Sequence, residues 1–254
     1  MVDEARRIDT DPRERPLRLL AVTHGVPTSQ NRTAVIRLVD GVASARPELD
    51  VSIAFVDAAH TDVASALVEG IDDPASIIVP LVLSAGYHVR TGLSQGLDRL
   101  ARRGASLADG LGPDERIVAV LAERLERMGL AETDAVVLAA AGSNDPRGVR
   151  ECFETARLLG ARLGRGVTVG FIAAANPRLP DAVEMIRAVH PGSRIVVAPY
   201  LLAPGVFYDQ AAQAGADAMS APLLLPDEPA ADELVALVLD RYDEVAEREL
   251  LAEA

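Results

Sequence analysis

The residues best suited to chemistry are two histidines, His24 and His88, and one aspartate, Asp57, each at the end of an apolar run or shortly after it. A neutral imidazole accepts a proton near physiological pH, and its nitrogen binds borderline divalent ions such as Fe²⁺, Co²⁺ and Ni²⁺. Two imidazoles and one carboxylate leave coordination positions open, whereas a saturated structural site would trap the ion. Together, these residues could accept protons or hold a divalent metal for transfer.

Three apolar runs predict the β-strands that position these residues, at 17–23, 51–57 and 77–83. Apolar residues at helical spacing separate the runs, and this alternation is typical of βαβ units with a parallel sheet. In the flavodoxin-like strand order 2-1-3-4, the first and third strands are neighbours, so His24 and His88 would reach one site. Asp57 would end the strand on the other flank of the first.

The same order of elements occurs twice along the chain. Gly25 aligns with Gly142, and Pro80 aligns with Pro199, at a nearly constant offset. We therefore predict an α/β fold with two similar lobes, each a four-stranded parallel sheet flanked by helices, and a ligand cleft between the lobes. The predicted boundaries are a disordered tail at 1–16, an N-terminal lobe at 17–130 and a C-terminal lobe at 131–254.

The candidate site residues are confined to the first half. In the repeat, His24 aligns with Ala141, Asp57 with Ala173 and His88 with Phe207. Features found in only one half are not needed to build the repeated fold, so they are candidates for function.

Two glycines and two arginines accompany the candidate site. Gly25 and Gly86 stand beside the histidines, where they would let a flat ligand approach the backbone. Arg32 lies in a segment without acidic residues, and Arg90 is the only charged residue between 77 and 97. We therefore expect the site to be less acidic than the chain as a whole.

The composition excludes several classes of protein. The net charge is −13 and only 3% of residues are aromatic, so we expect no nucleic-acid partner. The single cysteine, Cys152, excludes an internal disulfide, a Cys-based zinc site and an iron–sulfur cluster. There is no apolar run of membrane-spanning length and no signal-peptide pattern, so we expect a cytoplasmic protein that does not contact membranes.

Two other enzyme classes are disfavoured. GLSQG at 92–96 matches the G-x-S-x-G nucleophile elbow of hydrolases, but YHVRT separates it from the preceding strand. No G-x-G-x-x-G follows the first strand, which argues against a nicotinamide enzyme.

Four segments resemble the sirohydrochlorin cobaltochelatase/ferrochelatase family of ATP-independent class II chelatases. They are AVTHG (21–25), AFVDAAHTDVASAL (54–67), VPLVLSAGYHVR (79–90) and LAAAGSNDPRG (138–148). The resemblance extends over residues 17–247. It implies a chelatase-like fold and the insertion of Fe²⁺ or Co²⁺, with Ni²⁺ as a further candidate, into sirohydrochlorin or a related tetrapyrrole without a nucleotide.

The resemblance also implies roles for the candidate residues. By position, His24 and His88 handle the metal or accept the pyrrole N–H protons, and which histidine does which stays open. Asp57 stands where relatives have Glu, and would orient an imidazole or supply charge. Arg32 and Arg90 would bind the carboxylates of the tetrapyrrole.

Two loops differ from the family pattern and motivate a second hypothesis. HGVPTSQNR follows the first strand, where relatives tend to have an Arg-Asp or Asp-Pro-Arg stretch, and TGLSQG follows GYHVR, where relatives tend to have Val-Asp-Ile-Pro. The second hypothesis is a non-catalytic carrier of tetrapyrrole or metal. The sequence does not select the metal or the pathway, sirohaem or cobalamin-type, and it leaves both monomer and homodimer open.

Overall fold

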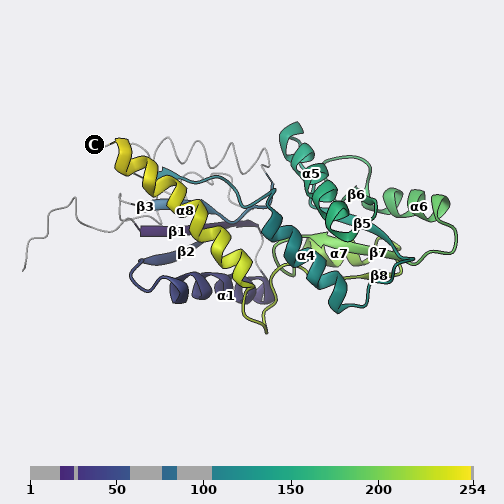
Figure 1. Ribbon diagram of the computed structural model, residues 1–254, viewed down its shortest axis with the longest axis horizontal. Helices are drawn as coiled ribbons and strands as arrows, with labels where there is room; N and C mark the ends of the chain where they lie inside the picture. Colours follow the sequence, from purple (N-terminus) through teal and green to yellow (C-terminus); the bar gives the residue numbers. More distant parts are fainter. Residues whose placement is uncertain (1–17, 26–27, 58–75, 85–104, 253–254) are drawn as a thin grey trace, which may run out of the picture.

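A computed structural model describes residues 18–25, 28–57, 76–84 and 105–252. They form two four-stranded parallel sheets, one toward each end of an elongated molecule (Figure 1). The predicted α/β fold with two similar lobes is confirmed. The predicted tail, the helix predicted between the second and third strands, and GLSQG lie outside the described residues.

The strand order is β2-β1-β3-β4 in the first sheet and β6-β5-β7-β8 in the second. In chain order, the strands are β1 (Arg18–Gly25), β2 (Val51–Asp57), β3 (Ser76–Pro80), β4 (Ser106–Leu107), β5 (Ala135–Ala140), β6 (Val167–Phe171), β7 (Ile195–Tyr200) and β8 (Ala218–Met219). Both orders are the predicted 2-1-3-4. Because every pairing is parallel, the carboxyl ends of the strands in each lobe lie at one edge of the sheet.

Helices cover these sheets. Within the described residues, the helices are α1 (Ser29–Ala45), α4 (Glu115–Arg127), α5 (Pro146–Leu163), α6 (Leu179–Val189), α7 (Val206–Ala212) and α8 (Asp232–Ala252). Of these, α1, α4 and α5 begin at residues whose side chains cap them. The side chains of Thr28, Asp114 and Asp145 accept hydrogen bonds from backbone N–H groups in the first turns of α1, α4 and α5. Each side chain satisfies one of the N–H groups that a helix start leaves without an internal partner.

Two helices cross between the lobes. α4 follows a strand of the first sheet but packs against α5 and β7 of the second lobe. α8, near the end of the chain, returns to pack against α1 and β3 of the first lobe (Figure 1). The strands of the first sheet therefore precede the predicted boundary at residue 130, and those of the second sheet follow it. In contrast, α4 precedes the boundary but covers the second sheet, and α8 follows it but covers the first sheet.

One apolar core extends through both lobes. It includes the fully buried Leu38 of α1, Leu121 of α4, Leu138 of β5 and Leu237 of α8. A smaller cluster covers the other face of the second sheet, under α6 and α7. Since burying a leucine side chain contributes roughly 1.5–3 kcal/mol, the crossing helices contribute much of the stability that joins the lobes.

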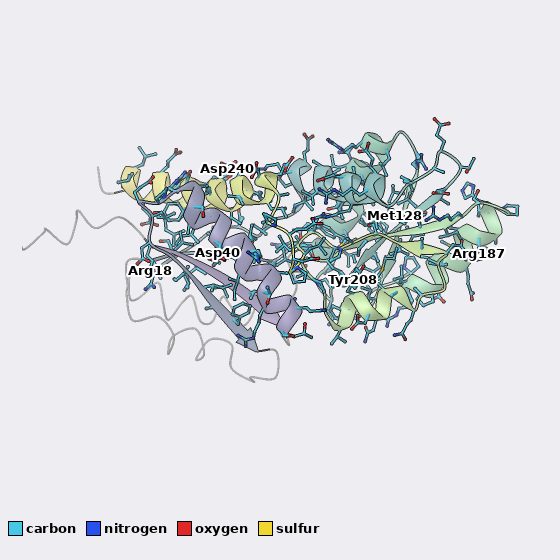
Figure 2. The ribbon with its side chains drawn as sticks, turned by 90° about the horizontal axis from the view of Figure 1, so that it is seen from below. Arg18, Asp40, Met128, Arg187, Tyr208 and Asp240 are labelled. Carbon is cyan, nitrogen blue, oxygen red and sulfur yellow. The ribbon has the colours of Figure 1, made fainter. Side chains whose placement is uncertain are left out.

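Charged side chains join α4 to α8. The carboxylate of Asp114 accepts hydrogen bonds from the backbone N and the Nε of Arg116, both at 2.9 Å, and lies 3.5 Å from Nη2 of Arg241 on α8. Arg116 also donates to Asp240, which lies on α8 (Figure 2). Burial alone would raise the pKa of Asp114, but the hydrogen bonds from Arg116 and the charge of Arg241 lower it below its usual value.

Candidate functional site

The carboxyl edge of the first sheet brings together the backbones of two predicted site residues. β1 extends through His24 and Gly25, so His24 lies inside the strand and not just past it as the sequence predicted. The reason is continued pairing with β2, in which His24 is opposite Val56 and Gly25 is opposite Asp57. His24 and Asp57 therefore lie on neighbouring strands, one register position apart.

The remaining predicted site residues are not placed. Gly86, His88 and Arg90, and the side chains of His24 and Asp57, lie outside what the structure describes. The convergence of the two imidazoles therefore stays a prediction.

The described chain continues for a few residues past β3, in the part of the sequence before His88. Beyond β3, the backbone N of Leu81 donates to the carbonyl oxygen of Val22 at 2.7 Å, so the chain stays beside β1 after the strand ends. It can be followed as far as Ser84.

Arg32 lies at the same edge of the sheet. It is in the first turn of α1, and its guanidinium carbon is 4.6 Å from the ring centre of Phe55, on β2 shortly before Asp57. Stacking on an aromatic ring stabilises the cation and restricts its position. The side chain is exposed, so its N–H groups can bind an acidic group that approaches from solvent.

The carboxyl edges of the two sheets face each other across the junction of the lobes. The Nδ2 of Asn31, in the first turn of α1, donates to the carbonyl oxygen of Pro204 at 3.1 Å, just before α7. The hydroxyl of Tyr200, at the end of β7, donates to the carbonyl oxygen of Leu83 at 2.5 Å, just past β3. A ligand at the carboxyl edge of the first sheet would therefore adjoin the second lobe.

The sequence analysis did not single out Tyr200 or its contact with Leu83. The phenol is buried, with the whole residue 2% exposed. The available signal was the repeat, because Tyr200 aligns with Leu81 and is therefore a polar group found in only one half.

The second lobe uses its own carboxyl-edge loop to build the fold. The backbone N of Asp145 donates to Oγ of Ser143, and the carboxylate of Asp145 caps α5. Gly142 has a φ of 94°, and a Cβ at this position would lie 1.8 Å from the carbonyl oxygen of Ala173. This close approach requires glycine.

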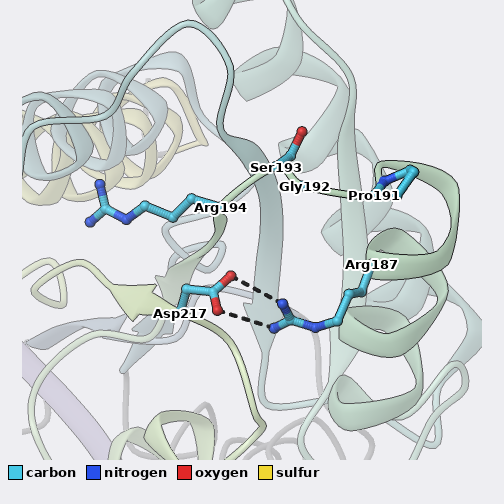
Figure 3. Close-up of a pocket in the computed structure, with 6 residues that line it drawn as sticks. All are labelled: Arg187, Pro191, Gly192, Ser193, Arg194 and Asp217. Atoms are coloured by element: carbon cyan, nitrogen blue, oxygen red, sulfur yellow. Dashed lines mark hydrogen bonds and ion pairs between the residues drawn. The ribbon is translucent and has the colours of Figure 1, made fainter.

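A separate depression of about 660 Å³ lies at the opposite edge of the second sheet, near the amino ends of β7 and β8 (Figure 3). Arg187 pairs with Asp217 at 3.3 Å, and Arg194 lies 3.5 Å from Asp134. A hydrogen bond from the backbone N of Ile195 is the main cause that lowers the pKa of Asp217. These charges are already engaged within the fold, so we assign no ligand to the depression.

Within the described ranges, no group of three His, Cys, Asp or Glu side chains could hold a metal ion. The side chains of His24, Asp57 and His88 are not among those described. His190 is exposed and ends α6, at the edge of the second sheet away from the junction. None of the described helices is long and apolar enough to cross a membrane.

Comparison with known proteins identifies the family. The profile of the CbiX family matches residues 18–128 and 135–226, and so covers both halves of the repeat. The chain belongs to the CbiX family. This confirms the resemblance found in the sequence.

Solved structures of SirB and CbiX share the fold. SirB from Bacillus subtilis with Fe³⁺ superposes with a TM-score of 0.66 at 19% identity, covering 89% of this chain and 95% of that one. SirB from Bacillus subtilis subspecies spizizenii in complex with cobalt gives a TM-score of 0.63 at 18% identity, covering 91% and 96%. CbiX, the terminal enzyme for the biosynthesis of siroheme in denitrifying bacteria, gives 0.60 at 21% identity, covering 89% and 98%. No curated protein is significantly similar in sequence.

Proposed function

We propose that this chain inserts a divalent metal, Fe²⁺ or Co²⁺ with Ni²⁺ as a further candidate, into sirohydrochlorin or a related tetrapyrrole without using ATP. The observation that carries the proposal is the match to the CbiX family across both halves of the chain. The structural neighbours add that related proteins of the same fold bind iron and cobalt.

The geometry supports a tetrapyrrole site at the carboxyl edge of the first sheet. His24 and Asp57 lie on neighbouring strands there, and Arg32 stands at the same edge on α1. In open parallel sheets, this edge is where ligands usually bind. The second lobe faces it through Pro204 and Tyr200, so a flat ring would lie between the lobes.

The proposed chemistry needs few protein groups. Metal insertion releases the pyrrole N–H protons and exchanges the ligands of the metal for ring nitrogens. His24 and His88 would accept these protons or hold the incoming ion, since a neutral imidazole does both near neutral pH. Asp57 would orient an imidazole or balance the charge of the metal, and Arg32 and Arg90 would pair with carboxylates of the ring.

The proposal is tested by following the absorption spectrum of sirohydrochlorin mixed anaerobically with the protein and, in turn, Fe²⁺, Co²⁺ or Ni²⁺. We expect insertion faster than in a protein-free mixture. His88→Ala and His24→Ala should each reduce the rate by about 100-fold, which is the size of effect that a positioned proton acceptor or ligand supplies. The matched control is His190→Ala, which removes an exposed histidine far from the junction and should leave the rate unchanged.

The same spectra separate catalysis from the carrier hypothesis. Ring that binds but stays without metal would favour a carrier, which the altered HGVPTSQNR and TGLSQG loops motivate. A wild-type rate equal to the protein-free rate, or a wild-type rate in His88→Ala, would overturn the chelatase proposal.

A further inference from the structure

The segment that leaves β3 is held by the second lobe at two consecutive residues. The hydroxyl of Tyr200 donates to the carbonyl oxygen of Leu83. The neighbouring residue, Ser84, lies beside the thiol of Cys152 on α5, close enough for its hydroxyl to lower the pKa of that thiol. Both partners of this segment are buried, with Cys152 1% exposed and Tyr200 2% exposed. The second lobe therefore holds this segment through buried contacts, out of competition with solvent.

The loop between β4 and α4 leaves room for the Tyr200 contact. A Cβ at Gly112 would lie 2.2 Å from the hydroxyl oxygen of Tyr200 and 2.4 Å from the carbonyl oxygen of Leu83. Both distances are far shorter than real Cβ contacts, so a larger residue would displace one of the two groups. Gly112 thus lets β3, β7 and the crossing connection meet at one point.

The hydroxyl of Tyr200 donates over the whole working pH range. Burial raises the pKa of its phenol far above the usual value, and the hydroxyl of Thr155 opposes this only in part. Burial also raises the pKa of the Cys152 thiol to about 11, so the sulfur stays protonated. These groups therefore act through their positions and do not exchange protons with a substrate.

The three side chains that make these contacts have apolar counterparts in the other half of the repeat. In the repeat, Tyr200 aligns with Leu81, Ser84 with Ala203 and Cys152 with Val35. The three counterparts are all buried apolar members of the common core. Apolar packing is therefore sufficient at this position of the fold, and the polar contacts serve the segment that follows β3 in the first lobe.

We propose that Tyr200 is a positioning residue for metal insertion, because its hydrogen bond to Leu83 fixes the start of the segment that continues to His88. This inference rests on the proposed function. Tyr200 touches neither metal nor ring in this proposal, and acts by setting where the chain departs from β3. Small displacements of a reacting group lower the rate of the chemical step strongly, with little effect on binding.

The test compares two tyrosine variants in the sirohydrochlorin assay. Tyr200→Phe removes only the hydroxyl that joins the lobes. We expect kcat to fall about tenfold, with KM for the ring within about twofold of the wild type. The matched control is Tyr208→Phe, which removes a tyrosine-to-carbonyl hydrogen bond, to Ser220 at 3.2 Å, inside the second lobe. We expect Tyr208→Phe to keep the wild-type kcat.

The melting temperatures of both variants show whether a loss of kcat follows from a loss of folding. If the wild type inserts metal and Tyr200→Phe keeps its kcat, the inference is overturned and the proposed function stands. The inference is equally overturned if both tyrosine variants lose kcat to the same extent. If the wild type inserts no metal, the proposed function fails and the inference fails with it.

A second variant keeps the inference testable if Tyr200→Phe does not fold. Ser84→Ala removes the contact with Cys152 one residue further along the same segment. Alanine already stands at the aligned position, Ala203, in the other lobe. We expect about a threefold loss of kcat with KM unchanged, because one of the two anchoring contacts remains. An unchanged kcat would count against the positioning role.

Discussion

The two lobes have the same strand order but different chemistry at their carboxyl edges. The first lobe presents His24 and Asp57 on neighbouring strands, with Arg32 stacked on Phe55 beside them. At the aligned positions of the histidine and the aspartate, the second lobe has Ala141 and Ala173. It uses its polar residues to cap α5 and shape a turn. One copy of the fold therefore carries the candidate site, and the other copy bounds and supports it.

The comparison separates residues that build the fold from residues that serve the site. Gly142 corresponds to Gly25 in the first lobe. Its positive φ and the close carbonyl oxygen of Ala173 explain why the fold needs glycine there. Tyr200 is not shared, since Leu81 occupies its aligned position and is equally buried. A buried hydroxyl where leucine suffices indicates a requirement beyond packing, because an apolar residue carries no desolvation cost.

The crossing helices offer the largest test of this comparison. Leu237 on α8 and Leu121 on α4 are fully buried, and each helix covers the sheet of the other half. Leu237→Ala and Leu121→Ala should each lower the free energy of unfolding by about 3 kcal/mol, from lost transfer energy and the cavity left behind. By hydrogen exchange, Leu237→Ala should expose the amides of β1 and β3 first, and Leu121→Ala those of β5 and β7.

The control for this experiment lies on the same helix. Leu250 is 66% exposed, so Leu250→Ala should change stability little. Faster exchange in β5 and β7 than in β1 and β3 for Leu237→Ala would contradict the crossed arrangement.

A glycine shared by both halves gives the second test. Gly142→Ala should lower the free energy of unfolding by roughly 2 kcal/mol, because alanine is strained at positive φ and its Cβ would meet Ala173. Gly205→Ala is the matched control, since its backbone is extended and the nearest atom, on Asn31, is 3.9 Å from the added Cβ. Denaturant unfolding measures both variants. Equal stability of the two would mean that the glycine at 142 is not required by the turn.

The smallest expected effect concerns the charges that join α4 to α8. Asp114→Asn should cost about 1–2 kcal/mol at pH 7, since it keeps a side-chain oxygen for the helix cap but loses charged hydrogen bonds with Arg116. The folded pKa of Asp114 is lowered, so its contribution is complete above the unfolded pKa of about 3.9. That contribution is lost as the pH falls through the folded value.

Urea unfolding at neutral and acidic pH checks this prediction. The stability difference between the wild type and Asp114→Asn should shrink below about pH 4. Asp240→Asn is a useful companion, because Asp240 is more exposed and should contribute less. A difference that stays constant with pH would show that the charge of Asp114 does not stabilise the crossing.

The sequence was sufficient for the sheets but not for the helices that cover them. Alternating strand and helix patterns, repeated at a nearly constant offset, predicted a parallel four-stranded sheet in each lobe, and both sheets have the flavodoxin-like 2-1-3-4 order that the site hypothesis assumed. The apolar faces of α4 and α8 indicate only that each helix must pack against something. Which sheet each helix covers depends on the direction of the connections before them, and residue pattern does not encode that direction.

The site was predictable in its residue types and only partly in its placement. The register of β1 with β2 puts His24 and Asp57 at one edge of the sheet. That His88 and Arg90 reach the same edge stays a prediction, because both lie outside the described residues. The repeat marks Tyr200 as a polar residue found in one half, but VVAPYLL does not reveal its partner, because a tyrosine in a buried strand usually counts as packing. Its partner is a backbone carbonyl of the other lobe, which leaves no trace in the residue pattern.

The crossing of α8 has a consequence for the order in which the protein is made. The strands of the first sheet leave the ribosome early, yet α8, which packs against them, is translated only after every strand of the second sheet. The second sheet has its crossing helix, α4, already available when β5 emerges. Since domains generally fold during synthesis as soon as their parts are present, the C-terminal half of this chain can close before the N-terminal half does.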